Sequence, residues 1–224
     1  VSIEDQDFSP MKEKTWNAAQ RRNFVILLAL AVIVFALYAG PNAKASENIA
    51  MVQVFNPDEA EPLPYVFHMI QPGENLAQTL KNFIFYDYYP YGFVYFAYSA
   101  IVLVPLQWLG QLQSIPLVML TLRQLVSVLP MLAALLLLVY LQDGFRTYRS
   151  IVLFAFLASI PAVVGNNLWW HPDGLATFLV ALTLFLLVRD RLRLGRNFYF
   201  AAVTCGLTVA TKLIGVYFFL AVGL

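Results

Sequence analysis

Acidic side chains stand at two places in this apolar chain, and both places have residue types suited to acid–base chemistry. Asp58 and Glu59 are adjacent and follow the first apolar run. Asp173 lies two residues after His171 and precedes another apolar run. A carboxylate can take the proton of a hydroxyl nucleophile as the new bond forms, which is general base catalysis. These three acidic residues are therefore candidate catalytic groups.

Two cations lie within apolar segments. Arg123 lies near the start of the run 115–141, and Lys212 lies past the middle of 198–224. A charge in the bilayer core costs at least ~2.5–3.5 kcal/mol on insertion scales, so such residues usually pair with another charge or line a site. Arg123 and Lys212, together with His171, are candidate ligands for a lipid-borne phosphate. Extension of either long side chain to the headgroups is the structural alternative.

The acidic motifs also have structural interpretations, and these stay open. An isolated Asp58-Glu59 pair is most often a solvated loop. Pro172 and Asp173 are typical of a helix N-terminus, where they satisfy the helix dipole and its unpaired N–H groups. Trp169 and Trp170 are typical anchors at a membrane interface.

The elements that must position these residues are membrane helices. Of 224 residues, 60% are hydrophobic and 12% are charged, and the mean hydropathy is +0.69. A helix needs roughly 20 apolar residues to cross the ~30 Å hydrocarbon layer. Continuous apolar runs favour helices over the alternating segments of a barrel. We expect an all-α, polytopic transmembrane helical bundle, with neither a disulfide framework nor a nucleic-acid partner. The apolar runs are 24–39, 93–109, 115–141, 151–164, 175–188 and 198–224.

Basic residues predict how these runs cross the membrane, because they favour the cytoplasmic side. Residues 1–23 carry four of them beside the first run and form a cytoplasmic N-terminal segment. The later basic clusters, 146–149 and 189–196, are both cytoplasmic only if 93–109 does not cross completely. Pro105 interrupts that run, and an amphipathic segment precedes it, with Leu76 and Leu80 on its apolar face.

We therefore predict five spans in a single transmembrane module, 24–224, which is C-terminally incomplete. Residues 41–114 form a long outer loop with interfacial or re-entrant helices. This topology places the acidic residues and His171 on one outer face. Arg123 and Lys212 then lie in the outer half of their spans, so the cations and carboxylates converge on one leaflet.

In these residues the chain resembles the GT-C superfamily of integral-membrane glycosyltransferases, in the branch of protein O-mannosyltransferases and aminoarabinose transferases. The resemblance covers nearly the whole chain and lies in the order of several motifs. The double proline that is usual in the second motif is missing at Pro90. The motifs are Asn56-Pro57-Asp58-Glu59-Ala60, Tyr88-Tyr89-Pro90-Tyr91-Gly92, Arg123 followed by Tyr140-Leu141, Asp173, and Gly206-Leu207-Thr208-Val209-Ala210-Thr211-Lys212.

The resemblance implies a GT-C-like bundle that moves a sugar from a polyprenyl-phosphate donor to an acceptor hydroxyl on the outer face, with inversion. Asp58 would be the base, with Glu59 or Asp173 orienting the acceptor. The donor phosphate would lie against Arg123, Lys212 and His171. No metal or other cofactor is expected, although a divalent metal stays open because one branch of the superfamily uses one.

The expected location is the bacterial inner (plasma) membrane, with the N-terminus in the cytoplasm. The expected partners are the donor, membrane lipids, an unidentified acceptor and other membrane subunits. Two other classes stay open. One is a non-catalytic GT-C-like subunit of a larger complex, and the other is a transporter, whose pathway intramembrane cations can also line.

Overall fold

The structure, a computed structural model, describes residues 16–44, 46–88, 90–191, 193–213 and 216, which form helices without a strand among them. Most of the predicted N-terminal segment, Tyr89 and the end of the last apolar run lie outside these residues. The helices are α1 (Ala18–Lys44), α2 (Ile49–Phe55), α3 (Pro57–Ala60), α4 (Leu63–Ile70), α5 (Leu76–Ile84), α6 (Phe93–Trp108), α7 (Ile115–Leu122), the π-helical η1 (Arg123–Val128), α8 (Leu129–Asp143), α9 (Arg149–Ala158), α10 (Pro161–Asn166), α11 (Asp173–Asp190) and α12 (Arg196–Thr211).

Among the described residues, two helices are long and apolar enough to cross a membrane. They are α1, with 27 residues, and the continuous helix Ile115–Asp143, with 29 residues, which joins α7, η1 and α8. The most apolar stretch of α1 is 11% buried, against 56% for Ile115–Asp143. The first helix therefore presents most of its apolar surface outward, as a lipid-facing helix does, while the second lies inside the bundle.

Two other predicted spans differ from the expectation. The run 151–164 is divided into α9 and α10, because Ile160 is extended before Pro161 and a residue that precedes proline disfavours the helical conformation. The predicted span 198–224 is wrong at its centre, since α12 ends at Thr211 and Lys212 is extended. Lys212 thus follows a helix instead of lying within one.

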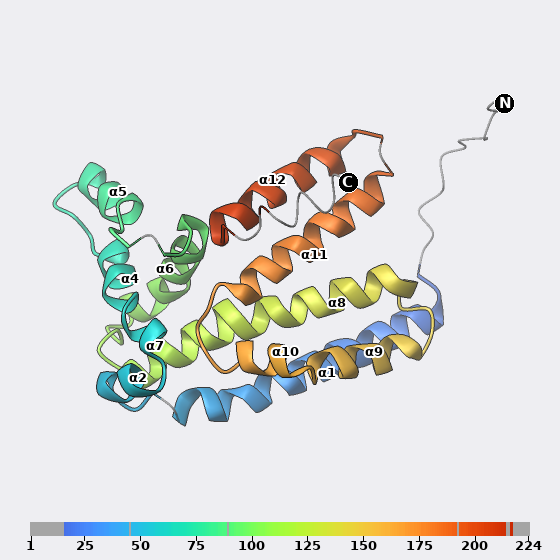
Figure 1. The fold of residues 1–224 in the computed structure, drawn as a ribbon, viewed down its shortest axis with the longest axis horizontal. Coiled ribbons are helices and arrows are strands. Elements are labelled where there is room, and N and C mark those ends of the chain that lie inside the picture. Colours follow the sequence, from blue (N-terminus) through green and yellow to red (C-terminus); the bar gives the residue numbers. More distant parts are fainter. Residues whose placement is uncertain (1–15, 45, 89, 192, 214–215, 217–224) are drawn as a thin grey trace.

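The bundle is built around α8. This helix packs against α11 on one side and against α1 and α9 on the other, and α12 packs on α11. Figure 1 shows these helices running side by side. Leu27, Leu132 and Phe154 belong to the apolar cluster that joins α1, α8 and α9. The core therefore fixes the order of the layers across the bundle.

Helices α2 to α6 gather at one end of this bundle (Figure 1). Helix α6 has 16 residues, fewer than the roughly 20 needed to cross a bilayer. It packs against α4 and α7, and buries Tyr95, Phe96 and Leu103 in a second apolar cluster. The arrangement agrees with the predicted outer loop 41–114, whose position relative to a membrane stays a prediction.

Helix α5 is the predicted amphipathic segment, and it is attached to the molecule through Asn82 and through Phe83, which packs against the apolar cluster of α6 and meets Phe93 edge to face. Asn82 is buried, accepts a hydrogen bond from Gln78 and donates one to the carbonyl of Gln71. Leu76 and Leu80 are exposed. The apolar face of α5 therefore points outward except at Phe83.

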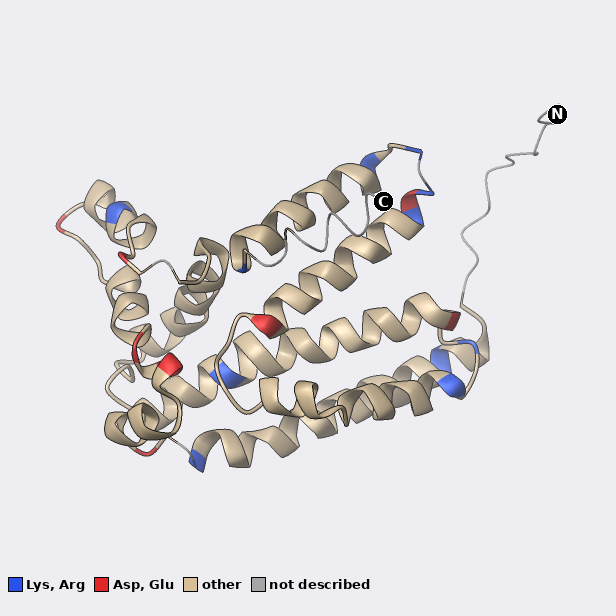
Figure 2. Cartoon of the chain, in the orientation of Figure 1, with Lys and Arg blue, Asp and Glu red and all other residues tan. Residues whose placement is uncertain are grey.

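Basic side chains gather at the opposite end, where α1 and α12 begin and α8 and α11 end (Figure 2). Gln20 and Asn23 tie the start of α1 to the turn after α8, with hydrogen bonds to the carbonyls of Gly144 (2.8 Å) and Phe145 (2.9 Å). The five-span prediction requires the basic clusters to share one end in this way.

Candidate functional site

Glu59 and Arg123 form a fully buried ion pair at the α2–α6 end of the bundle. Arg123 donates from Nε to Glu59 Oε1 (2.8 Å) and from Nη2 to Oε2, and both side chains have no exposed surface. Arg123 Nη1 donates to the carbonyl of Asn42 at the end of α1 (2.8 Å). The backbone N–H of Trp170 also donates to Glu59 Oε1. The pair therefore joins α1, α3, η1 and the loop before α11.

This geometry does not fit the predicted roles of the two residues. A phosphate ligand or an acceptor-orienting carboxylate must reach the substrate, whereas Arg123 and Glu59 face each other without exposed surface. Separating a buried pair is costly, because the remaining charge stays desolvated and unpaired. We assign both residues to holding the turn that carries Asp58 against the loop that carries His171.

Trp170 belongs to the same buried region and is not an interface anchor. Its ring is 1% exposed and stacks on Tyr95, with ring centroids 5.4 Å apart. Its indole N–H donates to Ser99 Oγ (3.0 Å), and Tyr95 donates its hydroxyl hydrogen to the carbonyl of Trp170 (3.2 Å). The loop before α11 is therefore anchored in the apolar core beside α6.

A second charged cluster is open to solvent. Asp173 begins α11, and its Oδ1 accepts a hydrogen bond from Lys212 Nζ just beyond α12. Its Oδ2 lies 3.1 Å from His171 Nδ1. The side chains of Asp173, Lys212 and His171 are 45%, 28% and 11% exposed. The structure thus brings three predicted site residues together where a ligand can reach them.

The imidazole of His171 is held from several sides. The Trp169 ring stacks on it with centroids 4.4 Å apart, and Tyr91 meets it edge to face at 5.4 Å. Its backbone N–H donates to Ser127 Oγ of η1 (3.0 Å). The Ser127 hydroxyl lies 3.3 Å from the carbonyl of His171, to which it donates. These contacts fix the start of α11 against η1.

Two glycines allow the close approaches on which this cluster depends. A Cβ at Gly174 would lie 2.5 Å from the carbonyl oxygen of Ser127. A Cβ at Gly92 would lie 2.0 Å from the carbonyl oxygen of Ala210, and the N–H of Gly92 donates to Thr211 O (3.1 Å). Gly92 therefore seats the neighbouring Tyr91 beside the end of α12.

Asp58 is an exposed carboxylate at this end of the bundle. Pro57 starts the single turn of α3, which turns Glu59 inward and leaves Asp58 exposed. In the described part of the chain Asp58 has no ion pair. Burial raises the pKa of Tyr91, and the charges of Asp58 and Asp173 add to this effect. Tyr91 thus lies within electrostatic reach of both carboxylates.

Tyr88 lies next to these groups. Burial, followed by the charge of Glu61, raises the pKa of Tyr88 to about 12. Its ring stacks on Tyr65 with centroids 4.9 Å apart. The hydroxyl of Tyr88 therefore keeps its proton to a higher pH than an ordinary tyrosine does.

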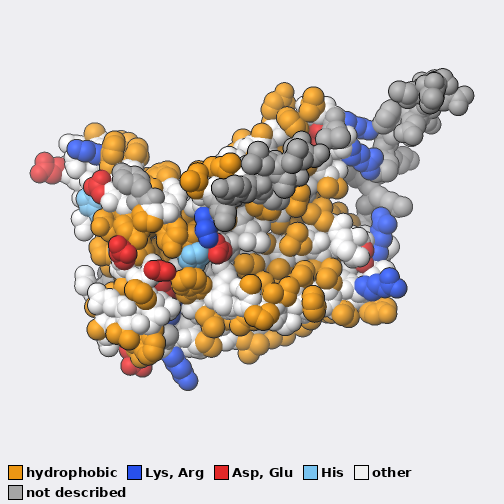
Figure 3. All heavy atoms as spheres, viewed as in Figure 1, with side chains coloured by type: hydrophobic (Ala, Val, Ile, Leu, Met, Phe, Trp, Pro, Cys, Tyr) orange, Lys and Arg blue, Asp and Glu red, His pale blue; other side chains and the backbone are white. Residues whose placement is uncertain are grey.

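Sequence reasoning missed Tyr91, Gly92, Ser127 and Gly174 as parts of the site. The first two lie in a motif that was singled out, but nothing local indicates that they meet α11 and α12. In Figure 3, acidic, basic and histidine side chains gather on one face, over the start of α11 and the end of α12. Within the described ranges, no three His, Cys, Asp or Glu side chains are grouped so as to hold a metal ion.

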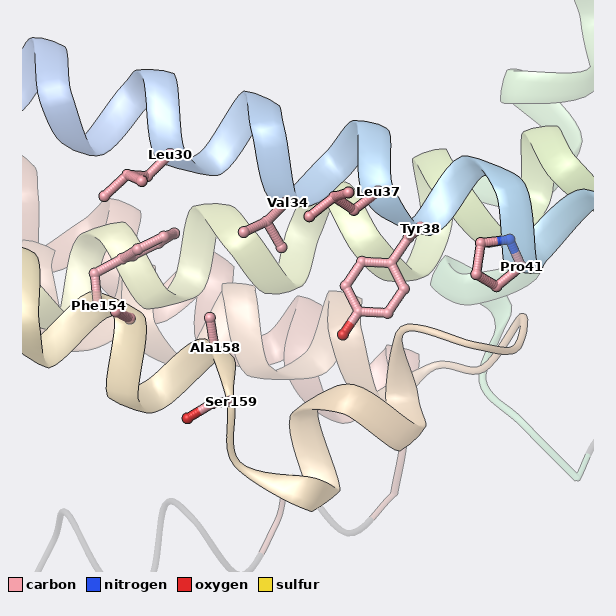
Figure 4. A pocket seen from close by; sticks show the side chains of 9 residues that line it. Leu30, Val34, Leu37, Tyr38, Pro41, Phe154, Ala158 and Ser159 are labelled. Atoms are coloured by element: carbon pink, nitrogen blue, oxygen red, sulfur yellow. The ribbon is translucent and has the colours of Figure 1, made fainter.

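A separate cavity of about 400 Å³ lies between α1 and α9 (Figure 4). Its wall is apolar apart from Tyr38 and Ser159, and none of the residues that line it carries a charge. The charged cluster does not line it. We therefore do not assign this cavity to the site.

Comparison of the chain with protein-family models, with curated proteins and with solved structures gave no match. The resemblance to GT-C glycosyltransferases thus rests on the sequence motifs. The site geometry is an independent basis for a functional proposal.

Proposed function

We propose that this protein is a membrane glycosyltransferase, which moves a sugar from a polyprenyl-phosphate donor to an acceptor hydroxyl. The proposal is carried by one observation. Asp58 is an exposed carboxylate that has no ion pair among the described residues. Its neighbour Glu59 accepts a hydrogen bond from the N–H of Trp170, which directly precedes His171 in the solvent-accessible cluster with Asp173 and Lys212. A base and a phosphate-binding group are the two functions that such a transfer needs.

Asp58 is the base. As the acceptor oxygen bonds to the anomeric carbon of the sugar, its proton passes to the Asp58 carboxylate and the bond from that carbon to the phosphate oxygen breaks. A single displacement, with the acceptor on the face opposite the leaving group, inverts the anomeric centre. The mechanism forms no covalent sugar–enzyme bond and therefore needs no second carboxylate nucleophile.

Lys212 and His171 hold the leaving phosphate, whose negative charge grows as the bond breaks. A donor placed at such a developing charge contributes ~3 kcal/mol by analogy with oxyanion holes. Asp173 faces both Lys212 and His171, with one carboxylate oxygen toward each. We therefore assign Asp173 to positioning Lys212 and His171, and not to the acceptor.

A lipid-borne donor also suits the architecture. The two candidate membrane-spanning helices, α1 and Ile115–Asp143, extend away from the end that carries the site. We propose that this end lies at the outer face of the bacterial inner membrane and that the basic end is cytoplasmic, as the positive-inside rule favours.

The test supplies the purified protein, in nanodiscs, with labelled polyprenyl-phosphate sugars and a membrane extract as the source of acceptors. Asp58→Asn should lower transfer by roughly 10²- to 10⁴-fold, the usual contribution of a general base. Glu61→Gln is the matched control, because Glu61 is an exposed carboxylate only three residues away. Equal transfer by Asp58→Asn and wild type would remove Asp58 from the mechanism.

A non-catalytic membrane subunit is the second candidate function. The observation that favours it is the pairing of Arg123 with Glu59 and of Lys212 with Asp173, since such pairs also occur as purely structural contacts. A subunit of this kind would transfer no sugar from any donor. It would also bind no polyprenyl phosphate.

A further inference from the structure

We propose that an anionic phospholipid binds along α1 and α9, with its phosphate at the arginines where both helices begin and one acyl chain in the apolar cavity between them. This site lies apart from the charged cluster at the opposite end of the bundle, and it does not depend on the proposed function. The ligand follows from the charge at one end of the two helices, the cavity farther along them, and the distance between the two.

The end where α1 and α9 begin is rich in arginine (Figure 2). Arg21 and Arg22 lie near the start of α1, Arg146 lies in the turn before α9, and Arg149 is the first residue of α9. All four residues are exposed, and none forms an ion pair with a residue that the structure describes. A guanidinium can donate to two oxygens of one phosphate, which an ammonium cannot do. This end therefore suits a phosphate ligand.

Two amide side chains of α1 hold the arginine-bearing segments together. Gln20 and Asn23 donate to the carbonyls of Gly144 (2.8 Å) and Phe145 (2.9 Å). Gly144 and Phe145 have φ angles of +65° and +62°, and this left-handed conformation is uncommon for a residue other than glycine. Backbone strain of this kind persists only where the surrounding structure holds it. The turn that carries Arg146 is therefore fixed against the start of α1.

The acidic residue in this turn does not neutralise the arginines. Asp143 accepts hydrogen bonds from the backbone N–H and the hydroxyl of Thr147 and from the hydroxyl of Ser150. Its carboxylate is thus engaged in holding the turn. Four arginines against one acid leave a net positive charge in these two segments.

The apolar cavity lies farther along the same two helices, and Figure 4 shows Leu30 of α1 and Phe154 of α9 pointing into it. Its volume is about 400 Å³. Leu37 lines it and is 68% exposed, so the cavity is continuous with the outward-facing apolar surface of α1. Apolar cavities stay dry, and one of about 150 Å³ holds a benzene molecule. A larger apolar cavity on a lipid-facing surface therefore suits a hydrocarbon chain.

The spacing between the arginines and the cavity fits one lipid. Helices α1 and α9 pack side by side and both begin at the arginine end (Figure 1). At 1.5 Å per residue, Leu30 lies about 12 Å along α1 from Arg22, and Phe154 lies about 8 Å along α9 from Arg149. The hydrocarbon of one leaflet is about 15 Å deep, half of the ~30 Å layer. An acyl chain whose phosphate lies at the arginines thus reaches the cavity.

The experiment places the protein in phosphatidylcholine vesicles with a trace of phosphatidylglycerol that is spin-labelled on its acyl chain. Electron paramagnetic resonance measures the share of labelled chains that the protein immobilises. Phosphatidylglycerol should associate at least about fivefold more strongly than phosphatidylcholine with the same label, the value of one basic side chain at an anionic surface. Raising the salt to roughly 1 M should weaken this preference in the wild type, because salt screens exposed charges. No preference, or one that salt does not change, would overturn the proposal.

The headgroup contact is tested by removing charge at the start of α9. Arg146→Gln with Arg149→Gln should lower the preference for phosphatidylglycerol by about fivefold or more. Replacing the same two arginines by lysine keeps the charge and loses the two-pronged contact, so the preference should be intermediate. Lys44→Gln is the matched control, because Lys44 is an exposed cation at the other end of α1. A preference that persists in the glutamine variant would overturn the headgroup site.

The position of the chain is tested by filling the cavity. Ala155 is exposed and lines the cavity, so Ala155→Trp should lower the immobilised share of labelled phosphatidylglycerol. Ala36→Trp is the control, because Ala36 is an exposed residue of α1 that does not line the cavity. An immobilised share in Ala155→Trp equal to that of the wild type would overturn the placement of the chain.

Two further outcomes would assign the site to another ligand. Displacement of the labelled lipid by inorganic phosphate would show a phosphate site that needs no lipid. A wild-type dimer that Ala155→Trp converts to a monomer would assign the cavity to a second copy of the chain. Either outcome would overturn the phospholipid and would leave the role of Asp58 unaffected.

Discussion

Removing one member of the Glu59–Arg123 pair should destabilise the protein more than any substitution in the open cluster. In Arg123→Met, Glu59 loses two charge-assisted hydrogen bonds and keeps only the N–H of Trp170. The carbonyl of Asn42 also loses its donor. An uncompensated buried charge of this kind costs ~3–5 kcal/mol. Unfolding by sodium dodecyl sulfate in mixed micelles measures the change in the free energy of unfolding.

Two further variants give this measurement its controls. Replacing both members together, as Glu59→Leu with Arg123→Met, should recover much of the loss, because well-packed apolar groups often substitute for a buried pair at little cost. Lys212→Met breaks a pair whose side chains are 28% and 45% exposed. Its cost should stay below about 1 kcal/mol, since solvent screens such pairs.

A cost under about 1 kcal/mol for Arg123→Met, the range expected for an exposed pair, would contradict a structural role for the buried pair. If the same variant also abolished binding of polyprenyl phosphate, Arg123 would be the phosphate ligand that its position in the sequence suggested. A loss of stability that the double variant does not recover would show that the two side chains act independently.

Lys212→Met should weaken polyprenyl-phosphate binding in nanodiscs while the protein stays folded, and unchanged affinity would remove Lys212 from the phosphate site. Gly174→Ala should cost ~1–3 kcal/mol by overpacking against the carbonyl of Ser127. Gly206→Ala is the control, and it should be neutral or stabilising because the space around Gly206 is open. Equal effects in the same unfolding assay would contradict the close approach of Gly174 to Ser127. The pKa of Tyr88 is about 12 in the folded protein against 10.0 ordinarily, so the folded state keeps this proton to higher pH than the unfolded state does. The contribution of Tyr88 to the free energy of unfolding is therefore complete below pH 10 and is lost between pH 10 and 12. Tyr88→Phe should flatten that part of the stability profile, and an unaltered profile would assign the loss to other groups. In a cysteine-free background, Leu168→Cys should react with an impermeant thiol reagent on intact cells and Arg146→Cys should not; the reverse would invert the proposed orientation.

The sequence alone was sufficient for the all-helical class of architecture and for the proximity of three charged or ionisable residues. Apolar run length and the scarcity of charge are local properties, and they predicted an all-helical chain with helices long enough to span a membrane. The basic clusters predicted that 93–109 does not cross, and the structure places α6 at one end with the rest of 41–114. The same topology placed His171, Asp173 and Lys212 on one face, where the structure brings them into contact.

Only the tertiary structure decided which charged groups are free to act. Asp58 and Glu59 are adjacent and chemically alike, and the single turn of α3 exposes one and buries the other. Arg123 is paired with Glu59, 64 residues away in the chain, and this contact removes both from the solvent. Ion pairing and desolvation depend on distances across the folded molecule. Neither the type of a residue nor its spacing from its neighbours contains those distances.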